Sequence, residues 1–203
     1  MANNSKSIYV DLDDVICNTT EHITAMARKE FGKSVSYESL TSFNLQHSFE
    51  LTDSEYNHFF SLIHEPQFLM EFKPIENSVS TLNEWKIKGY HIDIVTGRPS
   101  SSMSVSFEWL KEHNVPFDSL IIVDKYNREK SGSKEAISLI ELAQRSYDLA
   151  VEDSWDMAIF LSQTMLTPVA LPDRPWNRIE SQINNVHRTH SWHEIQSFEK
   201  NQI

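Results

Sequence analysis

Five short apolar runs, each bounded by polar turn residues, constrain the fold of this chain more than any other feature. They span residues 8–10, 92–95, 120–123, 149–151 and 168–171. Between the later runs, apolar residues recur at helical spacing over residues 101–113, 133–143 and 154–163. Strands that alternate with helices indicate a parallel sheet that is buried on both faces. We therefore predict an α/β fold, a Rossmann-like parallel sheet of about five strands with helices on both faces.

The interval between the first two runs has a different character. It contains no convincing strand, and its apolar spacing indicates several helices, one of which begins at the capping box formed by Thr52 and Glu55. A last helix follows Pro74 and runs toward Gly89. We predict an α/β core domain over residues 1–19 and 89–203, with a small helical cap domain inserted over residues 20–88.

Composition excludes several classes of partner. The 203 residues carry a net charge of −11 without a Lys/Arg cluster, which disfavours nucleic-acid polymers and anionic membrane surfaces. Cys17 is the single cysteine, so no disulfide within the chain is expected, and the polar first residues contain no hydrophobic leader. We expect a cytoplasmic protein whose partner is a small molecule. An anionic substrate would have to be met by a cation or by a few convergent basic groups.

The four glycines are too few and too scattered for the phosphate-binding loops that glycine-rich sequences form. Neither Gly-x-Gly-x-x-Gly nor a Walker-type loop can be written with Gly32, Gly89, Gly97 and Gly132. A classical dinucleotide-binding fold and a P-loop NTPase are therefore excluded.

An acidic pair, Asp11 and Asp13, directly follows the first apolar run. Buried carboxylates are costly unless a cation or a shared proton compensates them, so this pair indicates a metal or catalytic site. An EF-hand is excluded because Val15 and Ile16 stand where that calcium loop needs an acidic or amide residue and then glycine. An Asp-rich turn that only caps a helix is the structural alternative.

Polar residues follow each of the next three runs as well. Thr96, Gly97 and Arg98 follow the second run, a series of lysines follows the third, and Glu152 with Asp153 follows the fourth. The carboxyl ends of parallel strands meet at one edge of a sheet, which is where α/β proteins bind their ligands. We therefore expect these groups to converge on one site.

This order of motifs resembles the haloacid dehalogenase (HAD) phosphotransferase superfamily over nearly the whole chain. The resemblance implies that Asp11 is the nucleophile and Asp13 the acid/base, and that Thr96 and Gly97 bind the phosphoryl group. Lys134 resembles the third-motif lysine, although Lys125 and Lys130 compete for that role. The helical insert stands where C1-type caps occur. Asp14 is a departure, since many family members carry glycine at that place.

The resemblance also implies a cofactor and a mechanism. Mg²⁺ would be held by Asp11, the backbone carbonyl of Asp13 and Asp153, with Glu152 acting through water. Asp11 would form an aspartyl phosphate. Asp13, protonated when the substrate enters, would donate to the leaving oxygen and then activate water.

The substrate is suggested by a second resemblance. The stretch Asp-Arg-Pro-Trp-Asn at residues 173–177, together with Thr-Gly-Arg and Glu-Asp-Ser, resembles bacterial relatives of the 5'(3')-deoxyribonucleotidases. It implies a (deoxy)ribonucleoside monophosphate as substrate, with Arg98, Arg174 and Trp176 among the residues that bind it. Four cap aromatics could stack on a nucleobase or simply pack in the cap core: Phe43, Phe49, Phe68 and Phe72.

Two other functions stay open at this point. One is a phosphatase of another small ester such as a sugar phosphate, and the other is a non-catalytic HAD-fold binding protein. His187, His190 and His193 are interpreted as surface histidines, because a capping box at Ser191 separates the first two from the helix that carries the third. The oligomeric state is not predicted, and a homodimer stays open.

Overall fold

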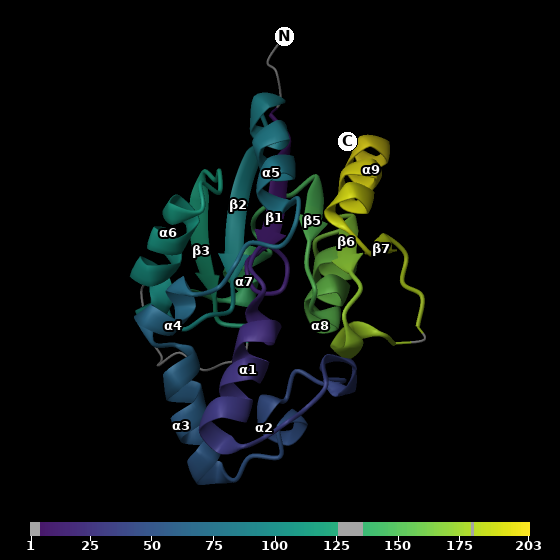
Figure 1. Cartoon of the computed structure of the whole chain (residues 1–203). Helices are drawn as coiled ribbons and strands as arrows, with labels where there is room; N and C mark the ends of the chain where they lie inside the picture. The colour runs from purple at the N-terminus through teal and green to yellow at the C-terminus, as the bar shows by residue number, and fades with distance from the viewer. Residues whose placement is uncertain (1–4, 126–135, 180) are drawn as a thin grey trace.

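The computed structural model describes residues 5–125, 136–179 and 181–203. At its centre lies a seven-stranded sheet in the order β4-β3-β2-β1-β5-β6-β7, in which every neighbouring pair is parallel (Figure 1). The strands are β1 (Ser7–Asp11), β2 (His91–Thr96), β3 (Ser119–Val123), β4 (Ala136–Ile137), β5 (Leu149–Val151), β6 (Val169–Pro172) and β7 (Val186–Thr189). The predicted parallel α/β sheet is confirmed. The two strands beyond the expected five are the outer strands: β4, which has only two residues, and β7, whose sequence Val-His-Arg-Thr gives little apolar signal.

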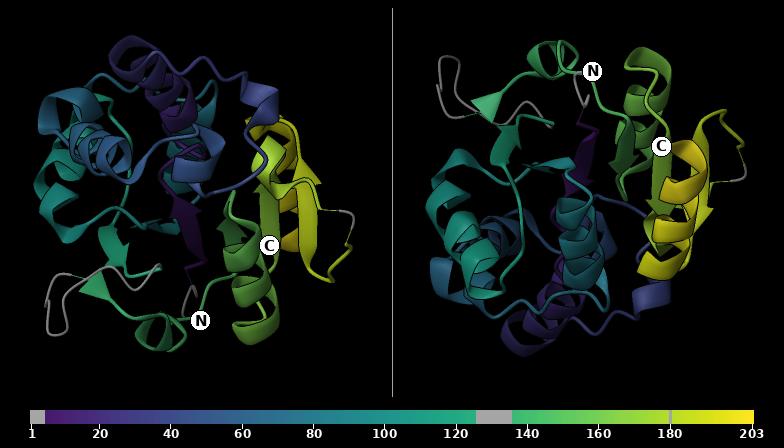
Figure 2. Two further views of the ribbon diagram at one scale, coloured as in Figure 1. Left: turned by 90° about the horizontal axis from the view of Figure 1, so that it is seen from below. Right: turned by 90° about the horizontal axis from the view of Figure 1, so that it is seen from above.

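The sheet is buried on both faces because alternate residues of its strands point to opposite sides. Ile8 and Val10 of β1 belong to one hydrophobic cluster, whereas Tyr9 between them belongs to a second one. The first cluster includes residues of α5 (Ser78–Ile87), α6 (Met103–Glu112) and α9 (Trp192–Gln202). The second includes residues of α7 (Leu139–Leu142), α8 (Trp155–Ile159) and the π-helical turn η3 (Phe160–Thr164). The views along the sheet show these two helical layers on either side of it (Figure 2).

The helix predicted over residues 133–143 is shorter than expected. Ala136 and Ile137 instead form β4, which pairs with the end of β3. Ser138 then caps α7 reciprocally with Glu141, so the helix begins at Leu139. The capping box predicted at Thr52 and Glu55 is present at the start of α3. At the one predicted at Ser191, Ser191 caps α9, but the Glu194 carboxylate accepts from the backbone N–H of His190 rather than from that of Ser191.

The helical insert lies beyond the carboxyl ends of the strands (Figure 1). It contains α1 (Thr19–Phe31), η1 (Tyr37–Ser39), α2 (Leu45–Ser48), α3 (Asp53–Ile63) and α4 (Pro66–Met70). Its apolar residues, among them Ile23, Phe59 and Leu69, join the cluster on the α5, α6 and α9 side of the sheet. Helix α5 lies within the residue range predicted for the cap, yet it packs against the sheet, with Trp85 5.9 Å from Trp192 of α9. The division into two domains stays a prediction.

The remaining short elements are η2 (Ser100–Ser102) and η4 (Pro175–Asn177). Over the described ranges, none of the helices combines the length and apolar character that a membrane span requires.

Candidate active site

The loop after β1 places two carboxylates at the carboxyl edge of the sheet. It is closed by backbone hydrogen bonds from Ile16 and Cys17 to the carbonyl of Leu12, each 3.0 Å long. Asp14 adopts a positive φ of 55°, a conformation that glycine favours and that aspartate tolerates. This conformation gives a physical reason for the departure at Asp14. Its buried carboxylate accepts from the backbone N–H of Thr20, at 2.9 Å, and so anchors the start of α1.

Three buried carboxylates meet at this edge, from Asp11, Glu152 and Asp153. Each offers an oxygen that lies within 4.8 Å of the others. Burial, and after it the charge of Glu152, raises the pKa of Asp11 well above its usual value. Burial followed by the charge of Asp11 raises the pKa of Asp153 in the same way. The arrangement is costly for the ionised forms and is suited to a cation with oxygen ligands.

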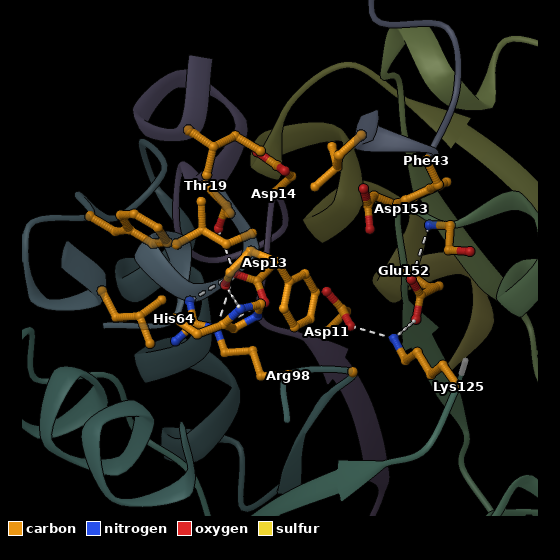
Figure 3. A pocket seen from close by; sticks show the side chains of 18 residues that line it. Asp11, Asp13, Asp14, Thr19, Phe43, His64, Arg98, Lys125, Glu152 and Asp153 are labelled. Atoms are coloured by element: carbon orange, nitrogen blue, oxygen red, sulfur yellow. Dashed lines mark hydrogen bonds and ion pairs between the residues drawn. The ribbon is translucent and has the colours of Figure 1, made fainter. Parts of the chain in front are cut away.

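Lys125, just after β3, supplies positive charge to this cluster. Its Nζ lies 2.6 Å from Asp11 Oδ1 and 2.9 Å from Glu152 Oε2, and its side chain is buried (Figure 3). Lys134, the sequence-based choice for the active-site lysine, lies outside the described residues. Lys130 lies outside them as well. Lys125 is the candidate lysine whose position the structure describes, and it contacts the predicted nucleophile.

Asp13 is held by Arg98 rather than by the acidic cluster. The guanidinium Nη2 lies 2.7 Å from Asp13 Oδ1, and Nε lies 3.0 Å from Oδ2. Burial alone would raise the pKa of Asp13, but the Arg98 charge and its hydrogen bonds outweigh burial and lower this pKa to about 2. Asp13 therefore favours its ionised form in the absence of substrate, and its protonation when the substrate enters stays a prediction.

Thr96 ends β2 beside this pair. Its hydroxyl accepts from the backbone N–H of Arg98 at 3.2 Å and lies 3.4 Å from Asp13 Oδ2. The Thr96 side chain is buried, and it is Gly97 next to it that lines the pocket. A direct contact between Thr96 and a phosphoryl group stays a prediction.

The structure places Arg174 and Trp176 behind the site rather than along its pocket. The Trp176 indole N–H donates to Asp153 Oδ2 at 2.8 Å, and Arg174 Nη2 donates to the backbone carbonyl of Asp14 at 2.7 Å. Both residues touch the loops that carry the acidic groups. Neither is among the residues that line the pocket over Asp11.

That pocket, of about 150 Å³, has a polar floor and an apolar roof. The floor is formed by Asp11, Asp13, Asp14, Thr19, Gly97, Arg98, Lys125, Glu152, Asp153 and Ser154, and the roof by Ile23, Phe43, Leu45, Phe60, Ile63, His64, Leu69 and Phe72. Figure 3 shows Phe43 on the side of Asp153, and His64 on the side of Asp13 and Arg98. The roof comes from the helical insert, so the pocket lies between the sheet edge and the insert.

The structure brings two of the four predicted cap aromatics to the pocket, and their stacking on a base stays a prediction. Phe43 and Phe72 line the pocket, whereas Phe49 is fully buried and packs 5.5 Å from Phe59 in the interior of the insert. Phe68 is not among the lining residues and packs against Phe72, with ring centroids 5.2 Å apart. Sequence reasoning missed Phe60 and His64, which lie one turn apart on α3 and its C-cap with their rings 4.4 Å apart. The apolar spacing of a helix identifies a face, but does not show whether that face meets a core or a pocket.

Comparisons with known proteins agree with this geometry. The model of a family described as "5' nucleotidase, deoxy (Pyrimidine), cytosolic type C protein" matches residues 5–131. A protein of Halalkalibacterium halodurans, named "Putative nucleotidase BH1399", is 25% identical over 95% of this chain and 92% of its own length.

Two solved structures share the fold. A haloacid dehalogenase-like hydrolase from Streptococcus pneumoniae superposes with a TM-score of 0.67 at 15% identity, covering 96% of this chain and 98% of its own. A HAD hydrolase from Bacillus subtilis, solved bound to magnesium, superposes with a TM-score of 0.60 at 11% identity, covering 97% of this chain and 99% of its own.

The family match, together with the nucleotidase relative, makes this protein a phosphoric monoester hydrolase, and its fold is the one that HAD superfamily phosphatases share. The family-model match covers more than half of the chain. This chain belongs to the deoxy (pyrimidine), cytosolic type C family of 5' nucleotidases.

Proposed function

We propose that this protein hydrolyses nucleoside monophosphates through an aspartyl phosphate formed on Asp11, with Mg²⁺ as cofactor. The observation that carries the proposal is the division of the pocket, whose floor is polar and largely charged and whose roof, apart from His64, is apolar and partly aromatic. A phosphomonoester with a flat, uncharged base has the same division. The family match and the nucleotidase name of the relative from H. halodurans support the same substrate class.

Asp11 would attack phosphorus. Attack forms a bond between a carboxylate oxygen and phosphorus and breaks the ester P–O bond, so the leaving oxygen must take up a proton. Water then attacks the same phosphorus, which releases phosphate, restores the Asp11 carboxylate and frees one proton. Two moderate steps thus replace one difficult step.

Asp13 would move these protons. The ionised form held by Arg98 is the form that the water step needs, because it accepts a proton. The leaving-group step needs Asp13 to carry a proton, which requires a weaker contact with Arg98 than the one observed. Thr19, whose hydroxyl donates to Asp13 Oδ1 at 2.5 Å, also fixes the orientation of this carboxylate.

Lys125 would neutralise charge on Asp11 and on the transferred phosphoryl oxygens. Glu152 holds Lys125 in place, since its Oε2 accepts from Lys125 Nζ and from the hydroxyl of Tyr9, at 2.7 Å. A phosphate group that enters the pocket would therefore meet an ammonium group that is already oriented.

The donor set fits Mg²⁺. Asp11, Glu152 and Asp153 supply buried carboxylate oxygens close together, and magnesium prefers oxygen ligands. We propose Asp11, Asp153 and the backbone carbonyl of Asp13 as ligands, with Glu152 acting through water. The ion would supply charge neutralisation for the phosphoryl oxygens and for the acidic cluster.

The helical insert would serve as a C1-type cap that selects the leaving group, while the sheet edge handles the phosphoryl group. We propose a cytoplasmic setting with a small-molecule phosphate ester as the partner, as the single buried Cys17 and the net charge of −11 suggest.

A panel of phosphomonoesters assayed with and without Mg²⁺ tests the proposal. We expect deoxyribonucleoside 5'- or 3'-monophosphates to be hydrolysed with higher kcat/KM than sugar phosphates, and only with the metal. Equal or better rates on glucose 6-phosphate or phosphoglycolate would contradict the nucleotidase assignment and leave a HAD phosphatase of another ester.

A further inference from the structure

The loop after β6 reaches the acidic cluster from behind. Asn177 Nδ2 donates to the backbone carbonyl of Asp153 at 2.8 Å and to that of Pro172 at the same distance. Trp176 donates to the carboxylate of Asp153, and Arg174 to the backbone of Asp14. Residues 174–177 therefore fix both the backbone and the side chain of Asp153. They also fix one backbone carbonyl, that of Asp14, in the loop that follows Asp11 and contains Asp13.

Trp176 is also in contact with the helical insert. The rings of Tyr37 and Phe43 approach its indole edge-on, with centroid distances of 5.8 Å and 5.9 Å. Both residues precede α2, far in sequence from β6. Trp176, with 8% of its surface exposed, thus stands between the insert and Asp153.

The hydrogen bond from Trp176 restricts the orientation of the Asp153 carboxylate. Among the residues that the structure describes, Trp176 supplies the hydrogen bond to the Asp153 carboxylate and no lysine or arginine pairs with it. The indole N–H donates to Oδ2, and one oxygen of the same carboxylate lies within 4.8 Å of an oxygen of Asp11 and of an oxygen of Glu152. An oriented donor behind a ligating carboxylate commonly changes metal affinity by about 10- to 100-fold when it is removed.

We propose that Trp176 is a positioning residue for the metal site, which orients Asp153 through its indole N–H and is itself held by Tyr37 and Phe43. The inference rests on the proposed Mg²⁺ site. It assigns the Asp-Arg-Pro-Trp-Asn stretch to the support of that site, and it makes the metal affinity depend on how the insert packs on Trp176.

Isothermal titration of the metal-free protein with Mg²⁺ tests this directly. The variant Trp176→Phe keeps an aromatic ring for Tyr37 and Phe43 but removes the N–H. We expect its Kd for Mg²⁺ to rise about 10-fold or more. An unchanged Kd would overturn the inference.

Trp85→Phe is the matched control. Trp85 is fully buried, and within the described residues its indole nitrogen has no hydrogen-bond partner. The same substitution there should lower the melting temperature while the Kd for Mg²⁺ is unchanged. A loss of affinity as large as that of Trp176→Phe would show that both variants act through general loosening, and would also overturn the inference.

Tyr37→Leu tests the link between the insert and the metal site. Measured alone, this variant is informative even if Trp176→Phe does not fold. Tyr37 does not line the pocket over Asp11, so its effect must be indirect. We expect Tyr37→Leu alone to weaken Mg²⁺ binding about 3-fold, and to have no further effect when combined with Trp176→Phe. Equal effects in both backgrounds, or none in either, would contradict the proposed link.

A failure of the proposed Mg²⁺ site would give a different result from a failure of the positioning role of Trp176. If the wild-type protein binds no Mg²⁺, or if Asp153→Asn binds it as tightly as wild type, the proposed metal site itself is wrong. If wild type binds and Asp153→Asn does not, an unaffected Trp176→Phe variant refutes only the positioning role.

Discussion

The Arg98 guanidinium contacts both carboxylate oxygens of Asp13, with Nη2 2.7 Å from Oδ1 and Nε 3.0 Å from Oδ2. The pair lies at the edge of the pocket floor, and 30% of the Asp13 side chain remains exposed. Asp13 is thus ionised but still accessible. This arrangement suits a proton acceptor, and it makes the role of Asp13 separable in experiments from that of Asp11, the buried residue that we propose as the nucleophile.

Asp13→Asn should lower the turnover rate about 100-fold or more, because the amide cannot accept a proton from water. The fold should persist, since the amide oxygen still accepts from Arg98. Mg²⁺ affinity should also persist, because the proposed ligand at this residue is a backbone carbonyl. Steady-state kinetics and metal titration on the same preparation check both expectations. A collapse of metal affinity would refute the ligand assignment.

The same pair predicts a pH dependence of stability. An unfolded aspartate has a pKa of about 3.9, and the pKa of Asp13 in the fold is about 2. A lowered pKa means that the ionised carboxylate stabilises the fold above about pH 4, and that this contribution is lost as pH falls toward 2. A difference of this size corresponds to roughly 2 to 3 kcal/mol.

Denaturant unfolding of the metal-free wild type and of Asp13→Asn between pH 2 and 7 measures that contribution. The difference in unfolding free energy between the two proteins should be constant above about pH 5 and should shrink below pH 4. A difference that does not change with pH would show that Arg98 does not hold Asp13 in its ionised form.

Much of the site could be predicted from the sequence because strand ends and motif order are local features. Asp11, Thr96 and Glu152 were placed correctly at one edge, since parallel strands bring their carboxyl ends together. Side-chain partners were not predictable. The resemblance predicts Trp176 as a substrate-binding residue, but it does not predict the donation to Asp153, which depends on how the loop after β6 folds back.

Asp11→Asn should abolish turnover and leave the fold intact. The amide is a poor nucleophile, so the activity of the variant should be more than about 100-fold below that of the wild type. Removing this charge also relieves repulsion with Glu152 and Asp153, so the melting temperature of the metal-free variant should not fall. A purified variant that keeps more than about a hundredth of wild-type activity would contradict nucleophilic catalysis by Asp11.

The two candidate lysines can be separated by substitution. Lys125→Gln removes the ammonium group that contacts Asp11 and Glu152, so we expect a loss of activity of about 100-fold or more and lower stability without metal. Lys134→Gln, made and assayed in parallel, should be the milder change. The opposite ranking would identify Lys134 as the active-site lysine and leave Lys125 as a structural ion-pair partner.

A pair of phenylalanines separates substrate recognition from packing. Phe60 lines the pocket roof, whereas Phe49 is fully buried away from it. Stacking on a base contributes about 1 to 3 kcal/mol, so Phe60→Leu should lower kcat/KM for a deoxyribonucleoside monophosphate by about 5-fold or more. The same variant should leave kcat/KM for phosphoglycolate, which has no base, unchanged.

Phe49→Leu is the control, and it should instead reduce stability by roughly 1 kcal/mol without changing the ratio of kcat/KM between the two substrates. If Phe60→Leu lowers both rates equally, the roof does not select a base, and the substrate class would then have to be one in which only the phosphoryl group is recognised.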